Sequence, residues 1–240
     1  VALWLGGLAL ASAGVGVLGV QVGALTPMQG FTLFGAGAVL GGALTLLLGL
    51  VALVATRASG VRPARRRAWL ATAIGASLVV VVAVAGSPGR GLPTINDITT
   101  NLSEPPAFRA AVQDPANVDR DMAYPAAFVP QVQAAYPDLA PIGIDASREV
   151  AYRRARDAAR ALGWEITWED PAGMGFEARD VSAIFRFVDD VAVRVRASEA
   201  GAVIDVRSKS RDGRGDLGVN AERIQSFAAR VQLTAPVASE

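Results

Sequence analysis

Two residue types are missing from this sequence of 240 residues, which contains no cysteine and no histidine. The absence of cysteine excludes disulfides and thiol nucleophiles. The absence of histidine removes the commonest general base and, together with that of cysteine, nearly all zinc sites. We therefore expect no enzyme activity, no bound metal and no cofactor.

Acidic residues are also missing from the first part of the chain, where the first one is Asp97. Through Ser87 the only ionisable side chains are five arginines, at positions 57, 62, 65, 66 and 67. The remainder holds 18 basic and 22 acidic residues, so the overall net charge of +1 conceals two parts of opposite sign.

Three apolar runs fill the part that lacks acids. They extend from Val1 to about Leu25, from about Gly30 to Thr56 and from Ala68 to about Ala85. A helix needs roughly 20 mostly apolar residues to cross a bilayer. The first run has no basic flank and is longer than the core of a signal peptide, so residues 1–87 are predicted to form a three-span transmembrane region.

The arginines predict the orientation of these spans. All five lie between the second and third spans, and the loop between the first two has no charge. The positive-inside rule then places the amino end in the cytoplasm and everything after Ser87 outside. The composition, rich in Ala and Arg, is typical of bacteria, so we expect an inner-membrane protein with a periplasmic domain.

The spans themselves favour packing over transport. They contain no ionisable side chain, which ion and proton pathways require. Gly19 with Gly23, and Gly37 with Gly41, form G-x-x-x-G pairs that allow helices to approach closely. These glycines indicate either packing among the chain's own helices or packing against another membrane protein.

Beyond the membrane, residues 88–144 hold nine of the thirteen prolines. Proline removes amide donors and restrains its neighbours to extended conformations, so we expect an extended arm that wraps a globular domain of residues 145–240. No regular helix or central strand is expected in this arm.

The domain is predicted to be α+β. Asp145 or Ser147 begins a helix that Gly163 ends, and a second helix starts near Asn220. The strands expected between them are residues 164–168, 175–179, 183–188, 191–197 and 202–210. Asp189-Asp190 and residues 199–201 are short enough to be hairpin loops, so the sheet should be antiparallel with both helices on one face.

A glycine motif follows the last strand, with Gly213, Gly215 and Gly218 spelling G-x-G-x-x-G. A dinucleotide fold needs another parallel strand after the next helix, and none is predicted. We expect Gly213 and Gly215 to take positive backbone angles and Asp216 or Asn220 to cap the helix. An anion site at these amides, flanked by basic side chains, stays open.

One face of the sheet is predicted to be charged. Alternation places on it Glu177, Arg179, Arg186, Arg194, Arg196, Asp205, Arg207 and Lys209. These residues form either a solvated surface of ion pairs or a docking face for a protein, a lipid head group or an acidic ligand. The mixed sign argues against nucleic acid.

Five stretches identify a resemblance. PTINDITT at 93–100 with PPAF at 105–108, LGWEI at 162–166, FRFVDDVAVRV at 185–195 and DVRSKSRDGRGDLGVNAERI at 205–224 resemble domain-of-unknown-function family 1499 (DUF1499). The resemblance implies a bacterial envelope protein, often with membrane spans ahead of the domain, and no established activity. The motif positions that it marks as a candidate site are Asp189, Asp190, Arg194, Asp205, Arg207, Ser208, Ser210, Arg211, Asp216 and Asn220.

The sequence thus predicts a non-catalytic integral membrane protein, an accessory subunit or assembly factor of a larger respiratory or photosynthetic complex. The alternative is a binding module for an anionic small molecule or lipid head group through Arg207, Lys209, Arg211 and the loop amides. A hydrolase that uses Asp189 or Asp205 is a third and weaker interpretation. The partners expected are the bilayer and other membrane subunits.

Overall fold

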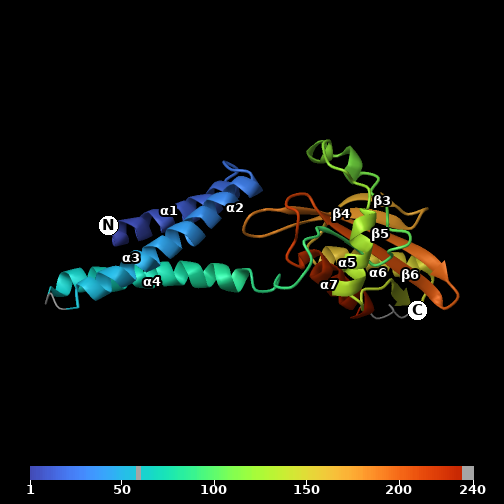
Figure 1. Cartoon of the computed structure of the whole chain (residues 1–240). Helices are drawn as coiled ribbons and strands as arrows, with labels where there is room; N and C mark the ends of the chain where they lie inside the picture. Colours follow the sequence, from blue (N-terminus) through green and yellow to red (C-terminus); the bar gives the residue numbers. More distant parts are fainter. Residues whose placement is uncertain (58–60, 234–240) are drawn as a thin grey trace. The chain divides into compact units, whose positions relative to one another are not determined.

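A computed structural model describes residues 1–57 and 61–233 (Figure 1). The chain forms two compact units. One comprises Val1–Arg90 with Ser182–Arg186, and the other comprises Gly91–Val181 with the chain from Phe187 onward. We refer to them as the helical unit and the sheet unit.

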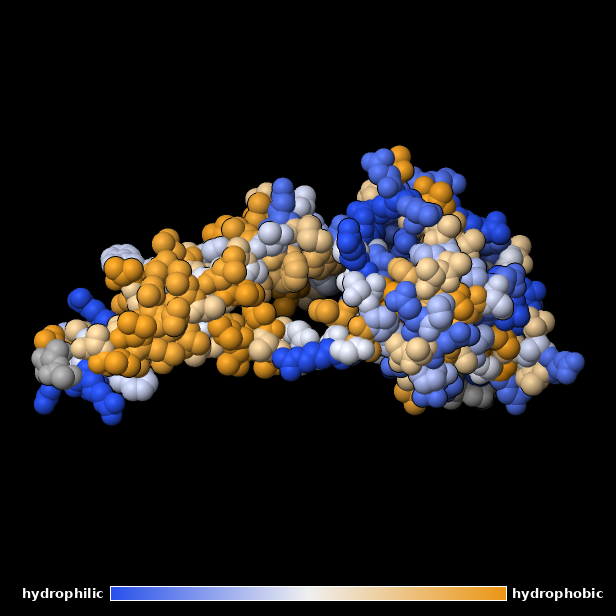
Figure 2. All heavy atoms as spheres, viewed as in Figure 1, coloured by the Kyte–Doolittle hydropathy of each residue, from blue (hydrophilic) through white to orange (hydrophobic). Residues whose placement is uncertain are grey.

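The helical unit contains three helices long and apolar enough to cross a membrane. They are α1 (Ala2–Gln21), the continuous helix Pro27–Ala55, and α4 (Arg62–Ala85). The second consists of α2 (Pro27–Gly35), a π-helical turn η1 (Ala36–Gly41) and α3 (Gly42–Ala55). The face of this unit that is in view is largely apolar (Figure 2), as the composition of the three runs predicts.

Glycines let these helices approach closely. A Cβ atom at Gly37 would lie 2.6 Å from the carbonyl oxygen of Ala9 on α1, and one at Gly75 would lie 2.4 Å from the backbone nitrogen of Leu46. Gly41 likewise faces Ala9. The chain's own helices therefore account for the predicted packing role of Gly37 and Gly41.

The other predicted packing pair differs. Gly23 follows the end of α1 in a turn with φ +73°, so it belongs to no helix and the prediction of a packing role for it is wrong. Gly19 faces Leu25 of the same turn, 2.6 Å from its would-be Cβ, and not a neighbouring helix. The apolar run continues past the helix end, which is why the sequence alone did not reveal the turn.

The sheet unit is built on an antiparallel sheet with the order β1-β6-β5-β4-β3, and β2 also pairs with β6. Its strands are β1 (Asp97–Thr99), β2 (Ile142–Ile144), β3 (Glu165–Asp170), β4 (Gly175–Val181), β5 (Val188–Ser198) and β6 (Gly201–Ser210). The predicted α+β class with an antiparallel sheet is confirmed.

One hairpin is misplaced by the sequence analysis. Asp189 and Asp190 are not a loop but lie inside β5, opposite Ser210 and Lys209 of β6, with 5% and 3% exposure. The turn falls earlier, at residues 182–187, so the strand expected at 183–188 is also absent, and Arg186 lies in this turn. Two adjacent aspartates are unexpected in a buried strand. Their burial is explained by the arginines that pair with them, Arg223 with Asp189 and Arg211 with Asp190.

The proline-rich segment forms part of the sheet unit. Its strands β1 and β2 pair with the same side of β6, one with residues 207–209 and the other with residues 202–204. Both are at the edge of the sheet, where the loss of amide donors at nearby prolines is tolerated. Between them lie η2 (Ala111–Gln113), η3 (Pro115–Asn117), η4 (Ala126–Phe128) and the short helix α5 (Val129–Ala135). The expectation that this segment contains no regular helix is therefore wrong, because Pro130 lies in the first turn of α5, where its missing amide donor is tolerated.

Two helices, α6 (Arg148–Ala161) and α7 (Val219–Leu233), form one apolar core with the sheet. Ser147 caps α6 by accepting a hydrogen bond from the backbone of Val150, and Gly163 ends it with φ +83°, as predicted. Trp164 stacks on Phe227 of α7 with ring centroids 5.0 Å apart. The apolar core therefore lies on the face of the sheet opposite to the predicted charged face.

Glycine packing in the helical unit gives a first prediction. Gly75→Ala places a methyl group against the backbone of Leu46, and overpacking of this kind costs roughly 1–3 kcal/mol. We expect thermal unfolding in detergent, followed by circular dichroism, to begin at a lower temperature. Gly7→Ala is the control, because a Cβ atom there meets no described atom within 4 Å. Equal midpoints for the two variants would contradict the packing.

Candidate functional site

The family-like motif is divided between the two faces of β6. Side chains alternate along a strand, so Asp205, Arg207 and Lys209 share one face while Ser208 and Ser210 share the other. The predicted assignment to one face is correct for seven of the eight charged residues, whereas Arg186 lies in the turn before β5. Glu177, Asp205, Arg207 and Lys209 are buried on this face. Arg179, Arg194 and Arg196 keep 35%, 26% and 40% of their side chains exposed, so the face is covered only in part.

Arg207 is the centre of the first face, with only 2% of its side chain exposed. Its Nε and Nη2 atoms donate to the two carboxylate oxygens of Asp97, at 2.9 and 2.7 Å. Further donors reach the carbonyl oxygens of Pro106 and Met122. The rings of Phe108 and Tyr124 lie 4.6 and 5.4 Å from the guanidinium carbon.

Lys209 shares the carboxylate of Asp97, at 3.3 Å. Two cations therefore meet one anion in a region that excludes water. Burial, together with the charge of Asp97, raises the pKa of the nearby Tyr124 to about 12, so its hydroxyl remains neutral.

Arg211 connects Asp190 of β5 to Asp114 of the proline-rich segment. It donates two hydrogen bonds to Asp190, at 2.8 and 2.7 Å, and one to Asp114 at 2.8 Å. Asn117 donates to Asp190 as well. The backbone amide of Ala116 and the Arg211 guanidinium lower the pKa of Asp114.

Asp205 is held by two arginines of β5. Arg194 and Arg196 each donate two hydrogen bonds to its carboxylate, and Arg194 also reaches Glu104. Burial alone would raise the pKa of Asp205, but the hydrogen bonds from Arg196 and Arg194 outweigh it and lower the pKa. A carboxylate so stabilised is a poor proton acceptor, which argues against a hydrolase based on Asp205.

The opposite face carries a separate network beneath α7. Ser208 donates to Asn220 at 2.6 Å, and Asn220 donates to Ser210 at 2.9 Å. Arg223 donates to Ser208 at 3.1 Å and to Asp189 at 2.5 Å. Burial raises the pKa of Asp189, while Arg223 opposes that shift. Ser208 and Lys209 therefore act in different networks, as do Asp189 and Asp190.

Several residues of these networks were missed by the sequence analysis, namely Asp97, Asp114, Asn117 and Arg223. A fifth, Glu177, was placed on the charged face but given no role. It is 2% exposed and accepts hydrogen bonds from the backbone amides of Arg109, Ala110 and Ala111. Its position between Phe176 and Ala178 in a predicted strand was the signal in the sequence that could have indicated a fixed partner. The chain thus fills this cluster of amides with its own carboxylate.

The glycine motif is a tight connection between β6 and α7. Gly213 and Gly218 have φ +85° and +90°, and Leu217 between them has φ +55°. The expectation of a positive φ at Gly215 is wrong. Glycine is favoured there because the backbone passes close to Thr94, and a would-be Cβ would lie 3.1 Å from it. Asp216 accepts from the amides of Gly218 and Asn220, which starts α7 as predicted. Since the strands described are antiparallel, this is not a dinucleotide loop.

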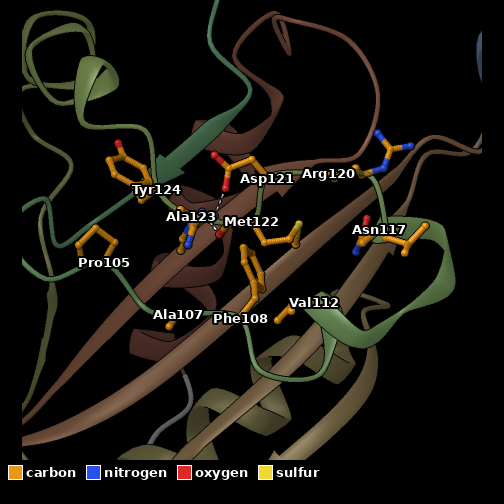
Figure 3. Close-up of a pocket in the computed structure, with 12 residues that line it drawn as sticks. Pro105, Ala107, Phe108, Val112, Asn117, Arg120, Asp121, Met122, Ala123 and Tyr124 are labelled. Carbon is orange, nitrogen blue, oxygen red and sulfur yellow. Dashed lines mark hydrogen bonds between the residues drawn. The ribbon is translucent and has the colours of Figure 1, made fainter.

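A cavity of ≈ 620 Å³ lies beside Arg207 and is lined mainly by residues 105–124 (Figure 3). Phe108 and Met122 lie in its middle, with Tyr124 and Pro105 to one side and Asn117 and Arg120 to the other. The Oδ1 atom of Asn117 and the hydroxyl of Tyr124 are buried without a described hydrogen-bond partner. Both atoms lie within the wall, inaccessible from the cavity.

No group of three or more metal-ligating side chains occurs in the described residues. All eleven candidate side chains named above instead bond to other groups of the sheet unit. A family model for proteins of unknown function, DUF1499, matches residues 97–231. The chain belongs to this family. The match begins at Asp97, so the DUF1499 region includes both members of the Arg207–Asp97 pair, and no curated protein matches the chain.

The buried pair of this DUF1499 domain gives a stability prediction. Asp97→Asn leaves Arg207 and Lys209 without their shared carboxylate, and removal of one member of a buried pair costs roughly 3–5 kcal/mol. Denaturant unfolding of the full chain, followed by tryptophan fluorescence, measures the loss. Glu169→Gln is the control, because Glu169 pairs with Arg156 and Arg160 at the surface, where such pairs contribute at most about 1 kcal/mol. A similar cost for both variants would refute the importance of the pair.

The lowered pKa values predict acid sensitivity. A carboxyl group whose pKa is lower in the folded state stabilises the fold above its unfolded pKa and loses that contribution as the pH falls. Asp205 and Asp114 are both of this kind. We expect the free energy of unfolding to decrease below about pH 4, and Asp205→Asn to flatten the decrease. An unchanged slope in Asp205→Asn would show that other groups cause the acid loss.

Proposed function

We propose that this DUF1499 protein is a non-catalytic integral membrane protein that acts as an accessory subunit or assembly factor of a larger membrane complex. The observation that carries the proposal is the commitment of the motif's buried charged side chains to internal pairs. Arg207, Arg211 and Arg223 each bind carboxylates of the same domain. Side chains that are paired in this way stabilise the fold and are not available to act on a substrate.

The composition of the spans supports the same role. The three helices have no ionisable side chain in their apolar runs, and many of their large apolar residues are exposed. Exposed apolar helices suit contact with lipid or with other spans. In the orientation we propose, the amino end is cytoplasmic and the sheet unit periplasmic, in a bacterial inner membrane. Respiratory and photosynthetic complexes are the proposed hosts.

A second function rests on the excess charge beside the cavity. Arg207 and Lys209 share one carboxylate, so this cluster has one more cation than anions, and Arg207 lines the cavity. A binding module for an anionic small molecule or lipid head group is the alternative that this observation favours. It requires an anion to compete with Asp97.

The complex is tested by extraction of the full chain from its native membrane in mild detergent, with identification of co-migrating proteins by mass spectrometry. We expect a stoichiometric partner in a particle much larger than the chain. Migration as a single small particle would refute the accessory role and leave the binding module as the better interpretation.

A paired variant locates the contact. Gly7 and Gly14 lie on one side of α1, where a Cβ atom meets no described atom within 4 Å. Gly7→Leu with Gly14→Leu should leave the chain's own packing intact yet detach a partner helix docked there. Val81→Leu with Val84→Leu on the exposed side of α4 is the control. Retention of the partner by both variants would exclude this side of α1 as the contact.

A further inference from the structure

A groove lies at the end of the helical unit where α1 and α4 begin. It has a volume of ≈ 550 Å³ and is lined by Leu3 of α1 and by Arg62, Pro63, Arg66, Arg67 and Leu70 of α4. Hydrophilic side chains gather at this end of α4, next to the apolar surface of the helices (Figure 2). The groove therefore combines positive charge and apolar surface at one place.

Helix geometry explains the combination. Residues four apart lie on the same side of a helix, so Arg62, Arg66 and Leu70 form a row, with Arg67 beside it. Ala68 and Ala71 face the other helices and are buried, with 4% and 0% exposure. Arg65 is exposed but does not line the groove. One side of α4 is thus basic for two turns and then apolar.

The groove's arginines have no internal counter-charge. All three are exposed, none forms an ion pair with a described residue, and no acidic residue precedes Asp97 in the sequence. Like charges four residues apart on a helix repel each other, and the dipole at a helix start also disfavours cations. An external anion would remove both costs.

The dimensions fit a phospholipid. Arg62 and Leu70 are separated by about 12 Å along the helix axis, since each residue advances by about 1.5 Å. The head-group layer of a bilayer is roughly 5–8 Å thick on each side, so a phosphate at the arginines has its acyl chains beside Leu70 and Leu3. A small inorganic anion would leave the apolar part of the groove unused.

We propose that this groove is a binding site for the head group of an anionic phospholipid. Arg62, Arg66 and Arg67 bind the phosphate, because guanidinium groups bind phosphate oxygens in pairs, and the acyl chains follow Leu3 and Leu70. The site is separate from the DUF1499 domain and from the proposed role in a complex. It requires only that the three helices lie in a bilayer.

The test uses the full chain, purified in a nonionic detergent and stripped of lipid. Phosphatidylglycerol or phosphatidylcholine is added in mixed micelles, and bound lipid is counted by native mass spectrometry. We expect one phosphatidylglycerol to be retained in preference to phosphatidylcholine. Arg66→Gln with Arg67→Gln should weaken its binding roughly 30-fold, since each arginine near an anionic lipid contributes a factor of about five.

A control with matched charge separates a site from diffuse attraction. Arg57→Gln with Arg65→Gln also removes two positive charges, but neither residue lines the groove, so binding should change less than about threefold. Leu70→Trp keeps every charge and fills the apolar part of the groove, so it should weaken binding without altering the net charge. This variant keeps the test decisive if loss of arginines disturbs insertion.

Three outcomes would overturn the site. Equal weakening by the two arginine pairs would show diffuse electrostatic attraction. Equal retention of phosphatidylcholine would remove the requirement for an anion. Protection against thermal unfolding by inorganic phosphate as strong as that by phosphatidylglycerol would indicate a site for free anions and not for lipid.

Discussion

The sheet unit depends on the buried pair of Arg207 and Asp97. Removing two charges from water costs several kcal/mol per ion, and only close geometry with further hydrogen bonds offsets that cost. Here Asp97 accepts from two nitrogens of Arg207, while backbone carbonyls and two aromatic rings occupy the rest of the guanidinium. The carbonyls and rings all belong to the proline-rich segment, so this segment must fold against the sheet for the pair to form.

The alternation of β6 extends this constraint to the whole unit. On one face, Asp205 and Arg207 of β6, with Arg211 directly after the strand, connect it to β5 and to the segment before α6. On the other face, Ser208 and Ser210 connect it to α7. One strand thus ties together parts of the chain that lie more than a hundred residues apart. The residues of this family motif are therefore explained by contacts within the fold as well as they would be by a functional site.

Local patterns in the sequence predicted the local structure. The three long apolar helices, the cap at Ser147, the stop at Gly163 and the faces of β4 to β6 follow from hydropathy, capping and alternation. The failures at Asp97, Asp189 and Asp190 share a cause. The strand position of Asp189 and Asp190 depends on Arg223 and Arg211, and the role of Asp97 depends on a residue 110 positions later. The spacing of residues within a short stretch of sequence carries no information on partners that lie far away in the chain.

The edge pairing of β1 with β6 also fixes an order of events during synthesis. β1 follows the end of α4 within about a dozen residues, yet its partner β6 is the last strand of the described sheet to be synthesised. Until residues 207–209 have been synthesised, Asp97 lacks its cationic partners and β1 has an open edge, and the core around Ile98 still lacks the residues of α7. Such edges invite pairing with other chains, so the growing chain is most vulnerable to aggregation over the hundred residues between the two strands.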